Sequence, residues 1–366
     1  MTKKVAADFP AGLGYRMPAE WEPQRATWLA WPHNRSDWPG KFAPIPYVYA
    51  EIVRHLARVT RVELIVKDAK AEAEARTILT HANVLQMPGL NAAIGFHHWP
   101  TNRGWLRDSG PIFVKDKAGR VAITDWRFNA WAKYKNWKLD NTIPGKIAEV
   151  RGCKSFEATV EVDGNLRQMV LEGGSIDVNG RGLLLTTEEC LLSPVQQRNP
   201  GMSREEIEAA LGSMLGVKKV LWLEHGIVGD DTHGHVDDIA RFVGPRTVLA
   251  ATEPNVADEN CAILKENFKR LRKMTDVEGK ALEVIPLPMP APVIFKGQRL
   301  PASYANFYIA NRTVLVPTFD DANDLKALSV IQKALPKHQI VPIYCGDLVW
   351  GLGAIHCMTQ QEPASK

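Results

Sequence analysis

The sequence has few of the features that mark secreted or membrane proteins. Its 366 residues include only five cysteines, an odd number with no Cys-x-x-Cys pair, so we expect no disulfide framework. No uncharged apolar run comes near the roughly 18 residues of a membrane-spanning helix, and no apolar segment follows Lys3 and Lys4 as it would in a secretory signal. These absences predict a protein of the reducing cytoplasm that is not embedded in a membrane.

The chain also lacks a strong charge of either sign. Its 45 basic and 41 acidic residues give a net charge of +4, which is too small and too evenly spread to indicate a nucleic-acid partner. With 45% apolar and 23% charged residues, the composition is that of a folded protein rather than a disordered one. No linker rich in glycine and serine divides the chain, so residues 1–366 are predicted to form a single domain.

Four segments have the pattern of two alternating strands around a turn, and they recur regularly. They start at positions 110, 174, 238 and 305, which are 64, 64 and 67 residues apart. Asn179-Gly180 is a strong hairpin turn signal, and the other turns carry weaker ones. We therefore predict β-hairpins over residues 110–125, 174–188, 238–253 and 305–319.

A helix and then a strand follow the hairpins. Ser203 and Glu206 predict a capping box that starts a helix over 203–215. Strands are predicted over 217–223, 282–287 and 339–343, and further helices over 256–274 and 325–335. Before the first hairpin, we predict strands over 26–31 and 61–67 and helices over 47–59 and 69–79. Residues 127–167 are predicted instead to form a long loop with one short helix near 143–150, and this loop is a candidate lid.

The repeated unit predicts an α/β ring. A unit of about 65 residues cannot bury both of its faces alone, so neighbouring units must pack together. Alternating helices and strands are also typical of a doubly wound sheet, but such a sheet has single strands between its helices, not pairs. We therefore predict a closed ring of mixed sheets, built from ββαβ units, with the helices outside.

Polar and reactive residues gather just before the hairpins. In a closed ring of repeats, equivalent positions have equivalent radius and height, so we expect these residues to converge near the axis. The stretches are Trp105-Leu106-Arg107-Asp108, Glu172-Gly173-Gly174, 230–238 and 351–361.

Cys357 is the candidate nucleophile. Gly351 and Gly353 precede it in a flexible backbone, His356 adjoins it, and polar residues follow. A cysteine that only fills an apolar slot would not need these neighbours. The other four cysteines have no such context, and we expect them to act as small hydrophobic residues.

The stretch around His235 allows three interpretations. His233, His235 and Asp238 are residue types that bind zinc, which would make the protein a zinc hydrolase. Alternatively, His235 is a general acid and base, and Asp237 binds a cationic substrate. The third interpretation is a polar loop that caps a helix.

Asp108, Glu172 and Trp105 also have structural interpretations. Asp108 could belong to a turn, Glu172 to a bend in a strand, and Trp105 to the core. The indole of Trp105 could instead hold a cation. The shared position of the two carboxylates before a hairpin favours a functional role.

Together, these residues favour chemistry on a planar cation. Carboxylates bind a guanidinium group through paired hydrogen bonds, and its positive charge stabilises a cysteine thiolate. Attack by Cys357 followed by protonation from His235 would release ammonia, and water activated by His235 would complete the change from guanidine to urea. Transfer of the amidino group to an amine shares the early steps and stays open. A guanidine-binding protein without turnover is the alternative outside catalysis.

Several motifs in order make the chain resemble one family over nearly its whole length. It is similar to the agmatine deiminases and the related bacterial, Porphyromonas-type peptidylarginine deiminases. The motifs are Met17-Pro18-Ala19-Glu20-Trp21-Glu22-Pro23, Trp105-Leu106-Arg107-Asp108-Ser109-Gly110-Pro111, Leu171-Glu172-Gly173-Gly174, Gly234-His235-Val236-Asp237 and Ile355-His356-Cys357-Met358-Thr359-Gln360-Gln361.

The resemblance implies a fold and a set of residue roles. The fold would be a five-bladed α/β propeller (pentein) of ββαβ units with pseudo-five-fold symmetry. Cys357 would be the nucleophile and His235 the acid and base, with Asp108 and Asp237 binding guanidinium. Glu172 would lie beside the histidine and the substrate. Trp105 and Gly353 would contribute to the substrate site. No metal or organic cofactor is expected.

The identity of the guanidine compound is predicted less directly. We favour agmatine, which would give N-carbamoylputrescine and ammonia on the route to putrescine, with Asp230 and Asp231 as candidates to hold its ammonium. Free arginine and peptidyl-arginine are the alternatives, and a homo-oligomer, either a dimer or a tetramer, stays open. The chain departs from the family's frequent Gly-Gly-Gly-Asn at Gly351-Leu352-Gly353-Ala354, which affects the expected substrate fit more than the reaction class.

Overall fold

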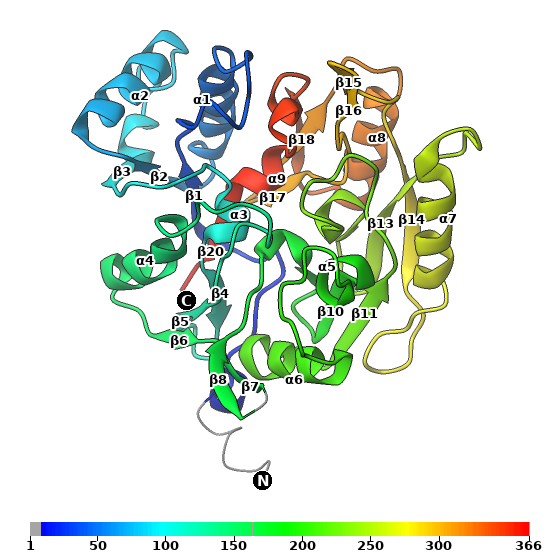
Figure 1. Cartoon of the computed structure of the whole chain (residues 1–366). Helices are drawn as coiled ribbons and strands as arrows, with labels where there is room; N and C mark the ends of the chain where they lie inside the picture. Colours follow the sequence, from blue (N-terminus) through cyan, green and yellow to red (C-terminus); the bar gives the residue numbers. More distant parts are fainter. Residues whose placement is uncertain (1–8, 163, 366) are drawn as a thin grey trace.

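Five β-sheets surround a common centre in the computed structural model, which describes residues 9–162 and 164–365 (Figure 1). Each sheet contains an antiparallel pair of strands, and the second strand of that pair is joined in parallel by a third. The fold is therefore the closed ring that the repeats predicted, and it is the five-bladed α/β propeller that the family resemblance implied.

The second sheet illustrates the unit. Strands β4 (Ile112–Lys115) and β5 (Val121–Asp125) form an antiparallel hairpin. Helix α4 (Ile143–Arg151) follows, and β6 (Ser155–Glu157) then pairs in parallel with β5. The predicted short helix near 143–150 is confirmed, but the interpretation of the rest of 127–167 as a long loop was wrong, because this segment also holds the third strand of its unit.

The next three units have the same order of elements, and this confirms the remaining predicted hairpins. The third sheet contains β9 (Asp177–Val178), β10 (Leu183–Thr187) and β11 (Lys219–Leu223), with α6 (Arg204–Leu215) between the last two. The fourth contains β12 (Ala240–Phe242), β13 (Thr247–Thr252) and β14 (Glu283–Pro288), with α7 (Glu259–Leu271). The fifth contains β17 (Tyr308–Ala310), β18 (Thr313–Thr318) and β19 (Gln339–Tyr344), with α8 (Asp324–Ala334).

The first sheet joins distant parts of the sequence. Strand β1 (Gln24–Ala30) pairs in parallel with β2 (Arg61–Val66) and antiparallel with β20 (Thr359–Pro363). The helices α1 (Ile45–Leu56) and α2 (Ala69–His81) and the outer strand β3 (Ile94–His98) complete it. The sequence did not predict β3 or β20, although β20 closes the ring.

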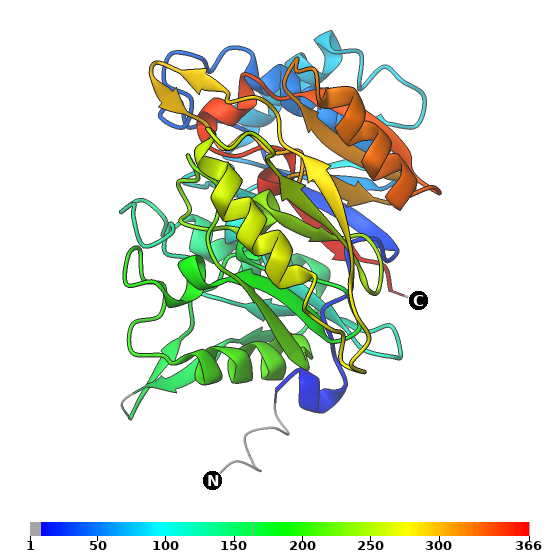
Figure 2. The ribbon, with the colours of Figure 1, turned by 90° about the vertical axis from the view of Figure 1, so that its right-hand side faces the viewer.

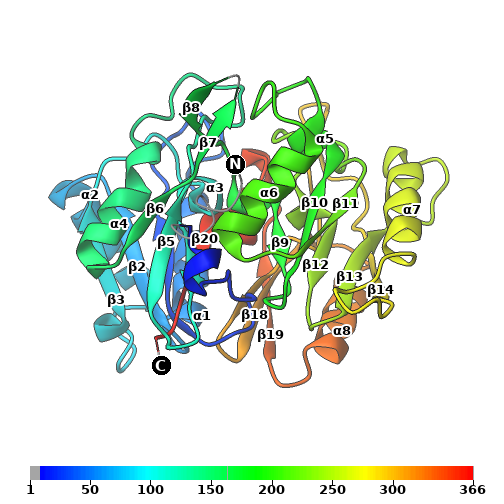
Figure 3. The same cartoon turned by 90° about the horizontal axis from the view of Figure 1, so that it is seen from below.

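The helices cover the outside of the sheets. Figure 3 shows α4, α6 and α7 on the outer surface, and Figure 2 shows α7 in front of the strands that it covers. The predicted capping box of Ser203 and Glu206 is present, and Ile207 and Leu211 bury the inner face of α6. Two-stranded ribbons of β7 (Thr159–Val162) with β8 (Asn165–Gln168) and of β15 (Ile294–Phe295) with β16 (Gln298–Arg299) lie outside the five sheets. Among the described residues, no helix has both the length and the apolar character to cross a bilayer.

Candidate active site

The segments before the hairpins meet at the centre of the ring, as predicted. Asp108 lies in the short helix α3 (Leu106–Ser109), and Cys357 lies in α9 (Ile355–Met358). Figure 1 shows both helices near the middle of the molecule. Glu172 and His235 each precede a single 3₁₀ turn. The side chains that the sequence singled out therefore come from four different blades.

The thiol of Cys357 is buried and lies against an amide and a carboxylate. The amide nitrogen of Asn306 donates to Cys357 Sγ over 3.1 Å, and Asp237 Oδ2 lies 3.8 Å from the same sulfur. Burial, together with the nearby carboxylates of Asp237, Asp238 and Asp108, raises the pKa of the thiol well above its usual value. The neutral thiol is thus favoured until a positive charge enters the site.

The carboxylate of Asp237 has one oxygen held and one free. Its Oδ2 lies 2.6 Å from His356 Nδ1, while Oδ1 is buried without a hydrogen-bond partner among the described residues. Although burial raises the pKa of Asp237, the contact with His356 holds it below its ordinary value. Its neighbour Asp238 accepts a 2.9 Å hydrogen bond from Asn306, and burial beside Asp237 raises its pKa well above the usual range.

Asp108 is fixed by two donors. Trp131 Nε1 donates to its Oδ2 over 2.9 Å, and the backbone N–H of Gly174 donates to its Oδ1 over 3.0 Å. Burial raises the pKa of Asp108 to about 6, and the charge of His235 opposes this shift. Each oxygen keeps a further lone pair for another donor.

His235 lies between two carboxylates. Its Nδ1 is 3.8 Å from Asp108 Oδ1, and its Nε2 is 3.5 Å from Glu172 Oε2. Burial opposes protonation of the imidazole, but Asp108, Cys190 and Glu172 raise its pKa well above the ordinary value. The fully buried Arg198 donates to Glu172 over 3.0 Å and holds that carboxylate in its ionised form.

A pocket of about 250 Å³ leads to Cys357 and Asp108. The indoles of Trp105 and Trp131 form part of its wall. Gly353 allows a close approach, because a Cβ there would lie 2.8 Å from Trp105 Cζ3 and 3.3 Å from the sulfur of Cys357. Leu352 also lines the pocket, in a left-handed conformation with φ of 67°, which is strained for a residue with a side chain.

The two acidic candidates for the substrate tail have different positions. Asp231 lines the pocket, accepts a 2.7 Å hydrogen bond from the Tyr134 hydroxyl and pairs with Lys133. Asp230 instead accepts hydrogen bonds from the backbone N–H groups of Thr232 and His235, so it holds the loop that carries the imidazole. The pocket also contains a second acid–base pair, Asp37 with Arg103.

A second group of buried charges lies beside the first. We call Glu20, Arg107, Asp177, Arg241 and His356 the ion-paired cluster, and Asp108, Asp237, Asp238, His235 and Cys357 the reactive cluster. In the ion-paired cluster, Glu20 Oε2 lies 3.0 Å from Arg241 Nη2 and 2.8 Å from His356 Nε2, and Arg241 Nε donates to Asp177 over 3.1 Å. His356 links the two clusters through Asp237.

The ligand set of the zinc interpretation is not assembled. His233 Nε2 lies 3.1 Å from Ser193 Oγ, and Asp238 accepts a hydrogen bond from Asn306. Among the described residues, the metal-binding side chains that lie close to His235 are those of Glu172 and Cys190 instead. The structure thus contradicts the triad of His233, His235 and Asp238.

Three residues of the site were missed from the sequence: Asn306, Trp131 and Arg198. Asn306 could have been found, because the structural β17 begins at Tyr308 and the asparagine therefore precedes a hairpin like the other site residues. Trp131 and Arg198 come from segments after a hairpin, where the positional rule gives no signal.

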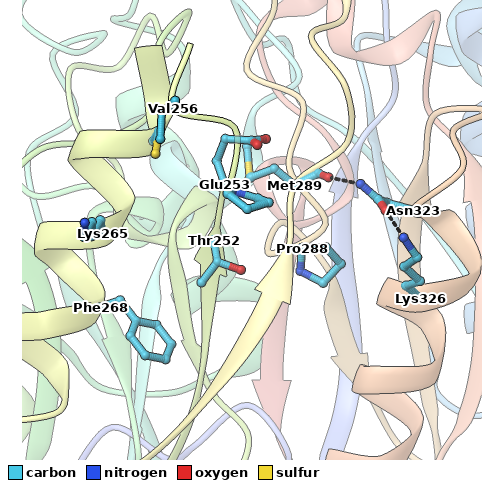
Figure 4. A pocket seen from close by; sticks show the side chains of 11 residues that line it. Thr252, Glu253, Val256, Lys265, Phe268, Pro288, Met289, Asn323 and Lys326 are labelled. Atoms are coloured by element: carbon cyan, nitrogen blue, oxygen red, sulfur yellow. Dashed lines mark hydrogen bonds between the residues drawn. The ribbon is translucent and has the colours of Figure 1, made fainter. Parts of the chain in front are cut away.

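A second cavity, of about 510 Å³, shares no lining residue with the pocket at Cys357 (Figure 4). It is formed between α7 and α8, and its wall is mainly apolar. Asn323 donates to the carbonyl oxygen of Met289 at its edge and accepts from Lys326. None of the predicted site residues lines this cavity.

Comparison with known proteins gives a consistent picture. The model of a family described as Porphyromonas-type peptidyl-arginine deiminase matches residues 16–363. The agmatine deiminase of Pseudomonas syringae pv. syringae (strain B728a) is 35% identical over 379 residues, which cover 97% of this chain and 97% of that protein.

Solved structures agree closely with the fold. The agmatine deiminase of Enterococcus faecalis superposes with a TM-score of 0.87 at 33% identity, covering 97% of this chain and 98% of that one. A substrate-bound cysteine-to-serine variant of the agmatine deiminase of C. jejuni has a TM-score of 0.82 at 29% identity, with 96% and 97% covered.

Proposed function

We propose that this chain, which belongs to the Porphyromonas-type peptidyl-arginine deiminase family, is a hydrolase of agmatine. The products are N-carbamoylputrescine and ammonia. One observation carries the proposal: the thiol of Cys357 is buried among carboxylates that a planar cation would neutralise. The product is an intermediate between agmatine and putrescine, so the step belongs to polyamine synthesis.

The guanidinium group binds between Asp108 and Asp237. The free Oδ1 of Asp237 and the remaining lone pairs of Asp108 accept its N–H groups. Two carboxylates from different blades fix the plane of the group and direct its central carbon towards the sulfur. This binding also brings the positive charge that the thiol needs in order to ionise, and the thiol releases its proton to solvent.

Attack by the thiolate then forms a carbon–sulfur bond and a tetrahedral adduct. Asn306 donates to the sulfur and holds it in line for the attack. His235, kept protonated by Asp108 and Glu172, gives its proton to a departing nitrogen, and ammonia leaves with the electrons of its bond to carbon. The remaining intermediate is an S-alkyl thiouronium on Cys357.

Hydrolysis uses the same groups in reverse. Neutral His235 removes a proton from a water molecule, whose oxygen attacks the central carbon. The carbon–sulfur bond breaks with its electrons returning to Cys357, the proton of the new hydroxyl group passes to the sulfur, and the neutral substituted urea leaves. Arg198 holds Glu172, which keeps the imidazole oriented through both steps.

The pocket supports an aliphatic tail that ends in an ammonium group. Trp105 and Trp131 enclose the methylene chain. Asp231, whose partner Lys133 has a side chain 40% exposed, takes the terminal ammonium as that lysine moves aside. Arg103 is neutralised by Asp37 and does not repel the tail.

The test is turnover by the purified protein with agmatine, free arginine and arginyl peptides, read as ureido product and ammonia. We expect agmatine to be preferred and Cys357→Ala to remove all turnover without changing the thermal unfolding temperature. Cys153→Ala, which replaces a half-buried cysteine outside the site, is the matched control and keeps its activity. Turnover that persists in Cys357→Ala, or a preference for peptides, would contradict the proposal.

We further propose that the protein acts in the cytoplasm. All five cysteines are free, which agrees with a reducing compartment. Cell fractionation with an antibody against the protein tests this, and recovery in an extracellular fraction would contradict it.

A further inference from the structure

A second thiol lies beside the proposed acid and base. Cys190 belongs to the short helix α5 (Glu188–Leu192), and its backbone N–H donates to Thr187 Oγ1 over 3.0 Å. The Thr187 hydroxyl donates in turn to the carbonyl oxygen of Gly234, next to His235. These two hydrogen bonds tie the segment that carries the thiol to the loop that carries the imidazole.

Three metal-binding side chains meet there. One ligand atom each from Glu172, Cys190 and His235 lies within 4.8 Å of the other two, and all three residues are buried. They come from three separate segments of the chain, so the packed ring holds them together rather than a short local motif.

The imidazole has unused binding capacity. His235 is 1% exposed, and its ring nitrogens lie in ionic contact with Asp108 and Glu172 but form no hydrogen bond with the described residues. Buried polar atoms are rarely left unpaired, so this side chain is one for which a ligand is expected. Its Nε2 lies 3.5 Å from Glu172 Oε2, a separation that a shared metal ion can span after a small movement.

We propose that Glu172, Cys190 and His235 form a binding site for Zn²⁺, and that the metal acts there as an inhibitor and not as a cofactor. The inhibitory effect rests on the role proposed above for His235, whereas the binding site itself does not. One thiolate, one imidazole and one carboxylate are the donors that zinc prefers, and sulfur disfavours magnesium and calcium.

The neighbouring arginine can stay in place when zinc binds. Arg198 Nε lies 3.0 Å from Glu172 Oε1 and 3.3 Å from Oε2. Zinc would take Oε2 while Oε1 keeps the guanidinium. The thiol of Cys190 loses its proton on coordination, so its negative charge and that of Glu172 offset the charge of the metal.

Zinc in this position would stop catalysis in two ways. With zinc on Nε2, the imidazole could not hold the second proton of its imidazolium form, so His235 could no longer act as an acid. It would also place a divalent cation close to Asp108, whose Oδ1 is 3.8 Å from the imidazole, and so weaken binding of a cationic substrate. We therefore expect zinc inhibition to be reversible by a chelator and competitive with agmatine.

The experiment must separate this site from the nucleophile, which is a second thiol that zinc could bind. We would measure zinc binding to the full-length Cys357→Ser protein by competition with a chromogenic chelator. Co²⁺ would serve as the spectroscopic probe, because a cobalt–thiolate bond gives a charge-transfer absorption. The expected result is one ion per chain with this absorption.

Adding Cys190→Ser or Cys190→Ala to Cys357→Ser should lower the zinc affinity at least tenfold and remove the charge-transfer absorption. Adding Cys345→Ser, at a buried cysteine outside the cluster, should change neither. Thermal unfolding shows which variants are folded, and two substitutions at position 190 guard against failure of one. No zinc bound, no thiolate absorption, or unchanged affinity without Cys190 would each overturn the proposal.

Activity gives the second readout. In protein with intact Cys357, Cys190→Ser should raise the zinc concentration for half inhibition at least tenfold relative to its own metal-free rate. Inhibition that is unchanged would mean that zinc acts at the nucleophile, and the proposed regulation would be wrong. Zinc binding with no agmatine turnover in the parent protein would instead contradict the proposed function and leave the site standing.

Discussion

The two groups of buried charges at the centre of the ring both combine carboxylates with a histidine, but only the ion-paired cluster contains arginine. In the ion-paired cluster, Glu20 is surrounded by Arg107, Arg241 and His356, and every formal negative charge has a cationic partner from the chain itself. In the reactive cluster, the carboxylates outnumber the cations, and Asp237 Oδ1 accepts no hydrogen bond from the described residues. In the ion-paired cluster, the buried atoms without a hydrogen bond are instead Nη2 of Arg107 and of Arg241, and each of them lies in ionic contact with Glu20.

The difference in charge balance gives the two clusters different roles: the ion-paired cluster stabilises the fold, and the reactive cluster binds the substrate. Removal of one partner from a paired, buried cluster leaves a charge that nothing compensates, so such a cluster is costly to change. A cluster with excess negative charge already carries that cost in the folded protein, and a substrate cation relieves it. The first cluster should therefore govern stability and the second should govern binding and rate.

The largest expected effect on stability is that of Glu20→Gln. Arg241 and Arg107 would lose their shared carboxylate in a buried site, which should lower the free energy of unfolding by about 3–5 kcal/mol. Urea denaturation measures this change. Glu278→Gln, at an exposed pair with Lys280, is the control, with an expected change within about 0.5 kcal/mol. Equal effects of the two substitutions would remove the distinction between the clusters.

Asp108→Asn should lower activity strongly without lowering the free energy of unfolding at pH 8. Loss of a guanidinium ligand should lower kcat/KM for agmatine about 1,000-fold, which corresponds to about 4 kcal/mol of transition-state binding. Because burial raises the pKa of Asp108 to about 6, its ionised form is disfavoured in the fold, and the variant should be at least as stable as the parent at pH 8. That gain should disappear towards pH 4, where the parent carboxyl is protonated too. A large loss of stability at pH 8 would place Asp108 with the ion-paired cluster.

Alkylation of Cys357 should depend on the charge of the reagent. Chloroacetamidine carries a planar cation, and chloroacetamide is its neutral counterpart. After correction for their rates with glutathione, we expect the cation to inactivate the protein at least about tenfold faster, because binding between Asp108 and Asp237 offsets the raised pKa of the thiol. Asp108→Asn should reduce this advantage. Equal corrected rates would mean that the carboxylates do not guide a cation to the sulfur.

The acidic side of the pH profile provides the smallest effect. We expect kcat/KM for agmatine to fall about tenfold per pH unit below about 6, because Asp108 must be ionised to bind the guanidinium group. Steady-state kinetics between pH 5 and 8 measure this limb. Asp140 is a useful control, since burial raises its pKa to about 7 although it does not line the pocket. If Asp140→Asn moves the acidic limb, the titration belongs to Asp140 and not to Asp108, which would contradict this prediction.

The fold was predictable where side-chain patterns are local. The hairpin turns and the apolar stripe of α6 could be found because each depends on residues close in sequence. Strand β20 could not, because its inward side chains are polar. Gln360 donates to the carbonyl oxygen of Pro111, and Glu362 accepts from Trp28 and Arg151, so no alternation of apolar residues marks the strand.

The site was predictable where it follows the repeat. Asp108, Glu172 and His235 share one position relative to their hairpins, and this position brings them together. Trp131 and Cys190 reach the same centre from segments outside that rule, and only the folded chain shows their distances to Asp108 and His235. The predicted zinc triad of His233, His235 and Asp238 was wrong for the same reason. His233 and His235 are close in sequence, but they face different surroundings in the fold.

The pairing of β20 with β1 has a consequence for the growing polypeptide. Ribosomes deliver Asp108 first, then Glu172, then His235, and the sulfur at position 357 only afterwards, directly ahead of the strand that seals the circle. A nascent chain halted before that point would carry these acids and the imidazole but would lack the proposed nucleophile, Cys357. We therefore expect premature fragments of this protein to lack the proposed deiminase activity, because the nucleophile is among the last residues made.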